Sequence, residues 1–239
     1  MLANGREAMV QRAVRSFIAQ TYAGSYRALL ILETSPRAPY WAAWADVLGT
    51  FPGVNVIQRP ELHGLTIGSL RNEAGRRTSA DIIIHWDSDD WSHSQRIAEQ
   101  VTLLENSGKE AAGYRDMLFW RTSPSVAQGY PTSMGDAWLY TNRNPQYCLG
   151  TSLCYWREAW QRDPFPDTSA GEDTLWLRGV QSRGISSLAG SRDSAQLIGA
   201  PRMIASIHGG NTYAKIEPRA EEWRRAPEWD EHCRKVMAL

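Results

Sequence analysis

The 239-residue sequence is poor in cysteine and carries no net charge. Its three cysteines, Cys148, Cys154 and Cys233, form no CxxC pair. They therefore argue against a disulfide framework or a structural zinc site, and they favour a reducing compartment. Lys and Arg together number 26, as do Asp and Glu. Bulk charge thus predicts neither nucleic acid nor an anionic membrane as a partner.

Long apolar runs, internal repeats and low-complexity segments are also missing. No stretch is apolar over the length that a transmembrane helix needs, and residues 1–17 lack the apolar core of a signal peptide. We therefore expect a cytoplasmic protein without a transmembrane segment. The length fits one large domain.

Phenylalanine is scarce, with four residues against 11 Trp and nine Tyr. Trp and Tyr combine a flat apolar face with a polar edge, which suits stacking against sugar rings or nucleotide bases. For most of the Trp residues, a place in the hydrophobic core is the simpler interpretation.

The first hundred residues alternate between helical and strand-like patterns. Apolar residues at helical spacing predict helices over 8–20, 39–48, 66–78 and 94–107. Short apolar runs predict buried strands over 28–32, 54–58 and 81–86. This alternation predicts an α/β fold with a mixed, mostly parallel sheet flanked by helices.

The second half of the chain has a different pattern. Its aromatic-rich strand candidates cover residues 116–121, 137–141 and 146–155. A helix is predicted over 173–183, and the charged tail from Pro218 predicts one or two surface helices. We therefore expect a smaller β-rich region in this half.

The acidic cluster Asp87-Ser88-Asp89-Asp90 directly follows the most apolar predicted strand. In α/β sheets, ligands bind beyond the carboxyl ends of the strands. Carboxylates two residues apart on a turn can hold one hard cation, Mg²⁺ or Mn²⁺, and leave positions for phosphate oxygens. The alternative is a solvated turn that caps the helix beginning near Ser92 or Ser94.

Two further motifs follow in the chain. Glu172 and Asp173 stand at a predicted helix start, where a carboxylate either caps the helix or serves as a general base for an acceptor hydroxyl. His208 lies beside glycines after an apolar run. A lone histidine is more often structural, but this one could complete an oxygen-rich cation site or contact a phosphate.

Taken in order along the chain, these and several shorter motifs form a set. They are Gln20-Thr21-Tyr22, Gly68 to Asn72, Ile82 to Trp91, Arg96 with Gln100, Gly150 to Tyr155, and Gly171 to Thr174. Over roughly residues 3 to 213 the chain resembles a family 2 glycosyltransferase with the GT-A fold. The resemblance implies an inverting enzyme that uses a nucleotide-diphosphate sugar, most simply a UDP-sugar, together with Mn²⁺ or Mg²⁺. The acceptor would be a sugar, a lipid-linked compound or another hydroxyl compound.

The resemblance also implies residue roles. Asp87 and Asp89, with Ser88 between them, would form the DxD motif that meets the metal and the donor's ribose and diphosphate, with His208 near the metal. Asp173 would be the catalytic base, with Glu172 beside it. The nucleotide would contact Asn4, Arg6, Glu33 and Arg71. The donor sugar and the acceptor would face Asp90, Trp91, Gly150, Thr151, Ser152 and the loop between residues 121 and 136.

On this basis residues 1–213 form the glycosyltransferase domain, with a nucleotide-binding half over 1–112 and an acceptor-side half over 113–213. Residues 214–239 form a helical extension. Two departures from the family concern the nucleotide base. Met1 to Arg6 matches only the end of the family's first strand and its loop, and Glu33-Thr34-Ser35 offers one acidic residue where the family has a pair.

Two other functions stay open at this point. A nucleotidyltransferase with a related α/β core would need a Gly-rich, basic phosphate loop near the start, where only Asn4-Gly5-Arg6 is available. A non-catalytic nucleotide-sugar binder would keep the same motifs without turnover.

Overall fold

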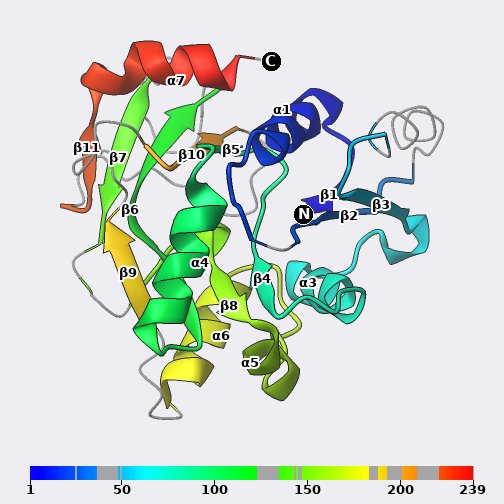
Figure 1. The fold of residues 1–239 in the computed structure, drawn as a ribbon. Helices are drawn as coiled ribbons and strands as arrows, with labels where there is room; N and C mark the ends of the chain where they lie inside the picture. The colour runs from blue at the N-terminus through cyan, green and yellow to red at the C-terminus, as the bar shows by residue number, and fades with distance from the viewer. Residues whose placement is uncertain are drawn as a thin grey trace.

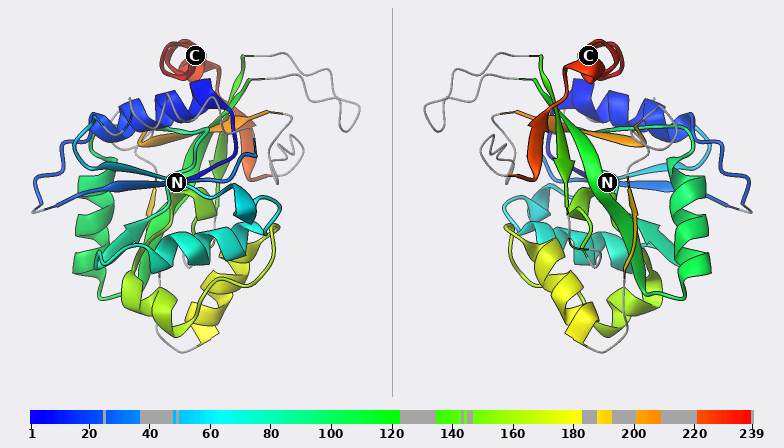
Figure 2. Two further views of the ribbon diagram at one scale, coloured as in Figure 1. Left: turned by 90° about the vertical axis from the view of Figure 1, so that its right-hand side faces the viewer. Right: turned by 90° about the vertical axis from the view of Figure 1, so that its left-hand side faces the viewer.

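The computed structural model describes residues 1–24, 26–36, 48, 50–122, 135–142, 144, 147–182, 188–192, 201–208 and 221–238. Except for Leu48, the helix predicted over 39–48 lies outside these residues, as does most of the loop between residues 121 and 136. The described part has the expected mixed α/β architecture, in which helices surround two sheets (Figure 1). Figure 2 shows α1 and α7 at one end of the molecule and α5 and α6 at the other.

The first sheet is parallel and has the order β1-β2-β3. It consists of β1 (Leu2–Ala3), β2 (Leu29–Glu33) and β3 (Val54–Gln58). Helix α1 (Glu7–Ile18) connects β1 to β2, and its buried face packs Val10, Val14 and Phe17 into the same hydrophobic core as Leu29. The alternating strand and helix patterns of the first hundred residues therefore correspond to a parallel sheet, as predicted.

The second sheet is mixed and contains the path β11-β7-β6-β10-β5. Its strands are β4 (Ile82–Ile84), β5 (Trp91–Ser92), β6 (Ala111–Arg121), β7 (Ala137–Thr141), β8 (Cys154–Trp156), β9 (Leu188–Arg192), β10 (Met203–Ile207) and β11 (Trp223–Arg225). The long strand β6 pairs in parallel with β9 and β10 and antiparallel with β7 and β8. The parallel character is thus strongest in the first half of the chain.

The remaining helices cover the sheets. They are α3 (Ile67–Arg76), α4 (Arg96–Ser107), α5 (Arg157–Arg162), α6 (Glu172–Ser182) and α7 (Asp230–Met237), with the short 3-10 helices η1 (Pro60–Leu62), η2 (Gly150–Ser152) and η3 (Pro227–Trp229). Local chemistry sets several ends: the Thr66 side chain accepts from Ser69 N to cap α3, and Gly108 ends α4 at a φ of 64°. Among the described helices, none is both long and apolar enough to cross a bilayer.

Two predicted segments differ from the structure. In the segment 146–155, η2 precedes the short strand β8, because the small polar residues Thr151 and Ser152 turn the chain before the apolar part begins. In residues 221–238 of the tail, α7 and the short η3 are helical as expected, whereas the strand β11, which pairs antiparallel with β7, was not predicted. Cys233 and Met237 on α7 pack against Leu118 and Leu139. All three cysteines are buried and free.

Strand β1 pairs with β2, with Leu2 opposite Leu32 and Ala3 opposite Glu33. The Met1 amine donates to Leu30 O at 2.7 Å, and burial lowers the pKa of that amine to about 5. On the other side, β4 pairs with β8 rather than with β1. A cavity of about 1190 Å³, lined by residues of β2 and β4, lies between the two sheets.

Candidate active site

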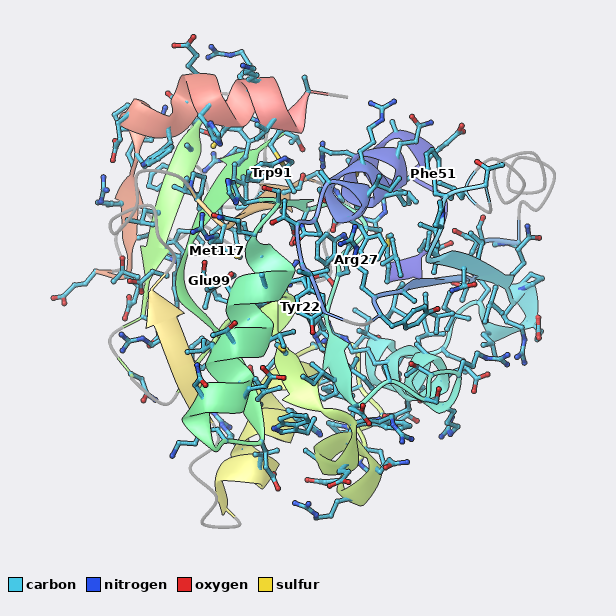
Figure 3. All side chains as sticks on the ribbon, in the orientation of Figure 1. Tyr22, Arg27, Phe51, Trp91, Glu99 and Met117 are labelled. Carbon is cyan, nitrogen blue, oxygen red and sulfur yellow. The ribbon has the colours of Figure 1, made fainter. Side chains whose placement is uncertain are left out.

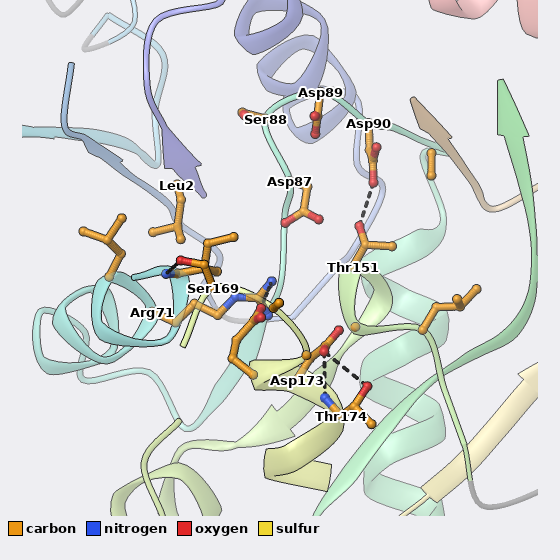
Figure 4. A pocket seen from close by; sticks show the side chains of 18 of the residues that line it. Leu2, Arg71, Asp87, Ser88, Asp89, Asp90, Thr151, Ser169, Asp173 and Thr174 are labelled. Carbon is orange, nitrogen blue, oxygen red and sulfur yellow. Dashed lines mark hydrogen bonds and ion pairs between the residues drawn. The ribbon is translucent and has the colours of Figure 1, made fainter. Parts of the chain in front are cut away.

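A pocket of about 1090 Å³ is lined by many of the residues that the sequence singled out, whereas His208, Gln20 to Tyr22, Arg96 and Gln100 are not among its lining residues. Residues 87–90, which follow β4, form part of its wall together with the loop after β1, residues 150–151 and the start of α6. Figure 4 shows Asp87 and Asp173 in this pocket with Arg71 and Thr151. The pocket thus lies beyond the carboxyl ends of β1 and β4, where ligands bind in α/β sheets.

The acidic turn is held firmly by its neighbours. Asp90, which is only 5% exposed, accepts hydrogen bonds from Thr151 Oγ1 at 2.6 Å and from Ser206 N at 3.0 Å. The Asp89 backbone carbonyl accepts from the Arg12 guanidinium, whose other nitrogen donates to Met237 O at 2.9 Å. The turn is therefore fixed from β10, from η2 and from α1.

The negative charges of Asp87, Asp89 and Asp90 lie close together, and this affects the pKa values of the three side chains. Burial raises the pKa of Asp87, and burial together with the charges of Asp89 and Asp87 raises the pKa of Asp90 well above its ordinary value. Burial also opposes ionisation of Asp89, but the His208 hydrogen bond and the Arg6 charge outweigh it and lower the pKa of Asp89. A cluster of this kind favours a bound cation, because a positive charge relieves the repulsion among the carboxylates.

Asp89 and His208 have suitable positions for two ligands of one cation. Asp89 Oδ2 lies 2.9 Å from His208 Nε2, close to the roughly 3 Å that separates neighbouring ligands in octahedral coordination at 2.0–2.1 Å. In the described residues, however, no three side chains of His, Cys, Asp or Glu are grouped as a metal site of their own. The protein would therefore contribute a partial ligand set, as Mg²⁺ sites beside phosphates often do.

The Arg6 guanidinium contacts both Asp89 and His208. Its Nη1 lies 3.0 Å from Asp89 Oδ2 and 3.1 Å from His208 Nε2. A guanidinium can only donate, so Nε2 cannot accept from Arg6 and at the same time donate to Asp89. A cation in this place would satisfy both Asp89 Oδ2 and His208 Nε2 as acceptors, which supports the fit of these residues to a metal.

Asp173 stands at the start of α6 and lines the pocket. Its Oδ1 accepts from Thr174 N at 2.6 Å. Its Oδ2 lies over Gly150, so close that a Cβ atom at Gly150 would be 1.5 Å away. In the described part of the chain no group donates to Oδ2, which leaves this oxygen able to accept a proton from a ligand hydroxyl.

Glu172, by contrast, is already engaged. It is 5% exposed, and its Oε1 lies 3.2 Å from Arg71 Nη2. Burial raises the pKa of Glu172, and the Arg71 charge opposes that rise. The two adjacent carboxylates therefore have different surroundings, and Asp173 is the one that is open to a substrate.

Arg71 contacts both His85, which follows β4, and Glu172 at the start of α6. Besides Glu172, Arg71 contacts the ring nitrogens of His85 through its Nη1. His85 Nδ1 donates to Gly150 O at 2.8 Å. Burial, followed by the charge of Arg71, lowers the pKa of His85 well below its ordinary value, so the ring stays neutral. Arg71 lines the pocket, but its two terminal nitrogens already contact His85 and Glu172.

Only some of the residues expected at the nucleotide base line the pocket. Asn4 and Arg6 line the pocket. Glu33 is only 2% exposed and lies outside the lining: its Oε1 accepts from Ser35 N at 2.6 Å and from Gly5 N at 3.3 Å. Glu33 thus supports the loop that carries Asn4 and Arg6, and its buried Oε2 has no hydrogen-bond partner among the described residues.

Among the residues expected at the donor sugar and acceptor, Asp90, Gly150 and Thr151 line the pocket, whereas Trp91 and Ser152 do not. Ser152 is fully buried, and its hydroxyl donates to Leu149 O at 2.8 Å. Trp91 lies beneath α7, where its ring makes an edge contact with His232 at 5.7 Å (Figure 3). The pairing of β5 with β10 directs Trp91 away from the pocket.

Sequence reasoning missed several residues of the site. Arg12 fixes the acidic turn, and its only sequence signal is an arginine among the buried positions of α1. Tyr147 and an aromatic group from β6, β7 and β11 also line the pocket. These positions depend on strand pairings that are distant in sequence, so no local pattern indicated them.

The sequence profile described as "Glycosyl transferase family 2" matches residues 2–128, which is more than half of the chain. The match ends shortly after β6. It therefore includes the acidic turn but not Asp173 or His208.

Solved structures show the same fold. The chain is similar to S. aureus TarS 1-349 in complex with UDP-GlcNAc, with a TM-score of 0.61 and 14% identity over 91% of this chain and 60% of that chain. It is also similar to TarS 1-349 in complex with UDP, with a TM-score of 0.58 and 14% identity over 86% of this chain and 59% of that one.

A third similar structure is the mannosyltransferase PcManGT from Pyrobaculum calidifontis in complex with GDP-Man and Mn²⁺. Its TM-score is 0.60, with 13% identity over 86% of this chain and 55% of that chain. At such identities the likeness shows the fold alone, which is the GT-A fold expected from the sequence. The chain spans less than two thirds of the length of these structures, and no curated protein sequence matches it.

Proposed function

Because the chain belongs to glycosyl transferase family 2, we propose that it transfers a sugar from a nucleotide-diphosphate donor to an acceptor hydroxyl. The observation that carries this proposal is the position of the Asp87–Asp90 turn and of Asp173 in one pocket at the strand ends. In this proposal, the carboxylates of the Asp87–Asp90 turn face a cation, and the Asp173 carboxylate faces the acceptor hydroxyl.

Asp173 has the base role in this proposal. Its Oδ1 is fixed by Thr174, so Oδ2 has a defined place from which to take the proton of the acceptor hydroxyl. The oxygen made nucleophilic in this way displaces the nucleoside diphosphate from the sugar in one step, with inversion at the anomeric carbon. Such a reaction needs one base and good alignment, and no covalent nucleophile from the protein.

Asp89 and His208 would hold Mn²⁺ or Mg²⁺, with Asp87 on the same turn as a further ligand. When bound, the metal neutralises the negative charge that develops on the leaving diphosphate. Until then, Arg6 supplies a positive charge beside Asp89. Arg6 and Asn4 then face the nucleotide from the loop after β1.

A UDP-sugar is the donor that we propose. TarS, one of the proteins of similar fold, was solved in complex with UDP and UDP-GlcNAc, whereas PcManGT was solved with GDP-Man and Mn²⁺. A pocket of about 1090 Å³ has room for a nucleotide sugar together with part of an acceptor.

Thermal unfolding with nucleotide diphosphates tests the proposal. A ligand that binds only the folded state raises the melting temperature with its occupancy. We expect UDP with Mn²⁺ to raise it, and we expect the rise to disappear with excess EDTA. Absence of a shift with UDP, GDP, ADP and CDP would contradict the proposal.

Product analysis separates the proposed activity from the two alternatives. A glycosyltransferase releases nucleoside diphosphate from the donor sugar, whereas a nucleotidyltransferase forms or consumes pyrophosphate. A non-catalytic binder shows the thermal shift but releases no UDP from UDP-sugars when a mixture of sugar acceptors is supplied.

A further inference from the structure

Three aromatic side chains form a group on the pocket wall: Phe119 on β6, Tyr140 on β7 and Trp223 on β11. The ring centroid of Trp223 lies 4.9 Å from that of Phe119 and 5.0 Å from that of Tyr140. Phe119 and Tyr140 are 6.4 Å apart. We call Phe119, Tyr140 and Trp223 the aromatic group.

The strand register brings these side chains to one face. Trp223 is directly opposite Tyr140 in the antiparallel pair β11–β7. Tyr140 is opposite Met117 on β6, and Phe119 lies two residues further on the same side of that strand. Cross-strand neighbours of this kind are close enough for their rings to touch. The aromatic group is therefore a fixed surface of the sheet rather than part of a loop.

The aromatic group is half-buried, unlike the closed aromatic core around Trp176. Its polar atoms are available at the edges. The Trp223 indole N–H donates to no acceptor in the part of the chain that the structure describes. Tyr140 accepts from Asn142 Nδ2 at 3.1 Å, and burial raises the pKa of Tyr140, so its hydroxyl keeps a proton to donate.

The position in the pocket indicates which substrate meets the aromatic group. Strands β7 and β11 lie at the left edge of the molecule in Figure 1, whereas β1, whose following loop would face the nucleotide, lies nearer the middle. Leu2 of β1, Trp223 of β11 and Asp173 all line the pocket. A donor held at Asp89 and His208 leaves the β7–β11 side to the molecule whose hydroxyl meets Asp173.

We propose that Phe119, Tyr140 and Trp223 form an acceptor subsite that binds a sugar ring, so that the acceptor is a carbohydrate. This inference rests on the proposed function for the assignment of the two sides of the pocket. A sugar ring has an apolar face of C–H groups and an edge of hydroxyls. The aromatic group offers matching chemistry, namely ring faces together with the Trp223 N–H, the Tyr140 hydroxyl and the exposed Glu222 carboxylate.

Ligand-observed saturation-transfer NMR tests the subsite directly. The probes are the methyl glycosides of glucose, galactose, mannose and N-acetylglucosamine, each added to the protein with UDP and Mg²⁺, because paramagnetic Mn²⁺ would broaden the ligand signals. The variants are Trp223→Ala and Trp223→Phe. Tyr26→Ala is the matched control, because Tyr26 is a 72% exposed aromatic residue outside this pocket.

We expect at least one glycoside to bind the wild-type protein and to bind Trp223→Ala about tenfold more weakly, the effect of about 1.4 kcal/mol. Trp223→Phe should retain part of the affinity, and Tyr26→Ala should bind as the wild type does. The UDP–Mn²⁺ thermal shift should be the same in all four proteins, which shows that Trp223→Ala is folded.

Three results would overturn the subsite: no glycoside binds the wild type, the glycosides bind Trp223→Ala equally well, or Trp223→Ala weakens UDP instead. The last result would place a nucleotide base on the aromatic group. Failure of the proposed function looks different, because the wild-type protein would then show no thermal shift with UDP and Mn²⁺ at all.

Discussion

The carboxylate of Asp173 lies directly against the backbone of Gly150, and a Cβ atom at Gly150 would be 1.5 Å from Asp173 Oδ2 and 2.7 Å from Asp173 Cβ. Position 150 can therefore hold only glycine if Asp173 keeps its place. Gly150 O is held in turn by His85, so the backbone under Asp173 has little freedom to move away.

Gly150→Ala should therefore impair catalysis by displacing Asp173. We expect turnover to fall by about 10²-fold, because a displacement of about 1 Å at a reacting group has this effect. UDP binding, measured by the thermal shift, should stay unchanged. The double variant Gly150→Ala/Asp173→Asn provides the control: if Gly150 acts through Asp173, it should be no slower than Asp173→Asn alone. Additive losses would contradict this coupling.

Asp89→Ala should remove the metal dependence of donor binding. Asp89 Oδ2 lies 2.9 Å from His208 Nε2, and losing Asp89 leaves His208 as the remaining ligand of this pair. We expect the UDP–Mn²⁺ thermal shift to drop to that of UDP with EDTA. Glu158→Gln, which removes an exposed carboxylate on α5, is the control and should keep the full shift. A full shift in Asp89→Ala would remove Asp89 from the metal site.

His85 should make stability depend on pH. Its pKa in the folded protein lies well below the ordinary value of 6.5, so the unfolded chain binds the extra proton as the pH falls. The stability is thus present above about pH 6.5 and is lost below it, by up to about 1.4 kcal/mol per pH unit.

Urea unfolding at pH 7.5 and 5.5, compared between the wild type and His85→Gln, measures this contribution. Subtracting the variant removes the effects of Asp87 and Asp90, whose raised pKa values act in the opposite direction. An equal loss of stability in both proteins on acidification would contradict the neutral state of His85.

Much of this site could be predicted because its signals are local. The run Ile82 to Ile84 followed by Asp87 to Asp90 places carboxylates after a buried strand, and the structure confirms that strand and puts the turn in the pocket. The position of Asp173 at the start of a helix could also be predicted, because the Pro-rich loop and the helical periodicity both mark that boundary.

The parts that could not be predicted depend on pairings between distant segments. Trp91 is next to the acidic turn in sequence, yet the pairing of Ile204 with Trp91 directs its ring beneath α7. Trp223 enters the pocket only because it pairs with Tyr140, which lies far away in the chain. Glu33 had the expected residue type, but its contacts with Gly5 and Ser35 made it a support for a loop.

The comparison of Asp173→Asn with Glu172→Gln tests the central claim most directly, with release of UDP from a UDP-sugar as the readout. Both changes remove one negative charge at the start of α6, but Glu172 is already paired with Arg71. We predict that Asp173→Asn lowers UDP release by about 10²–10⁴-fold, the usual contribution of a general base. It should leave the UDP–Mn²⁺ thermal shift intact, whereas Glu172→Gln keeps much more of the activity. Near-full UDP release by Asp173→Asn would contradict the account.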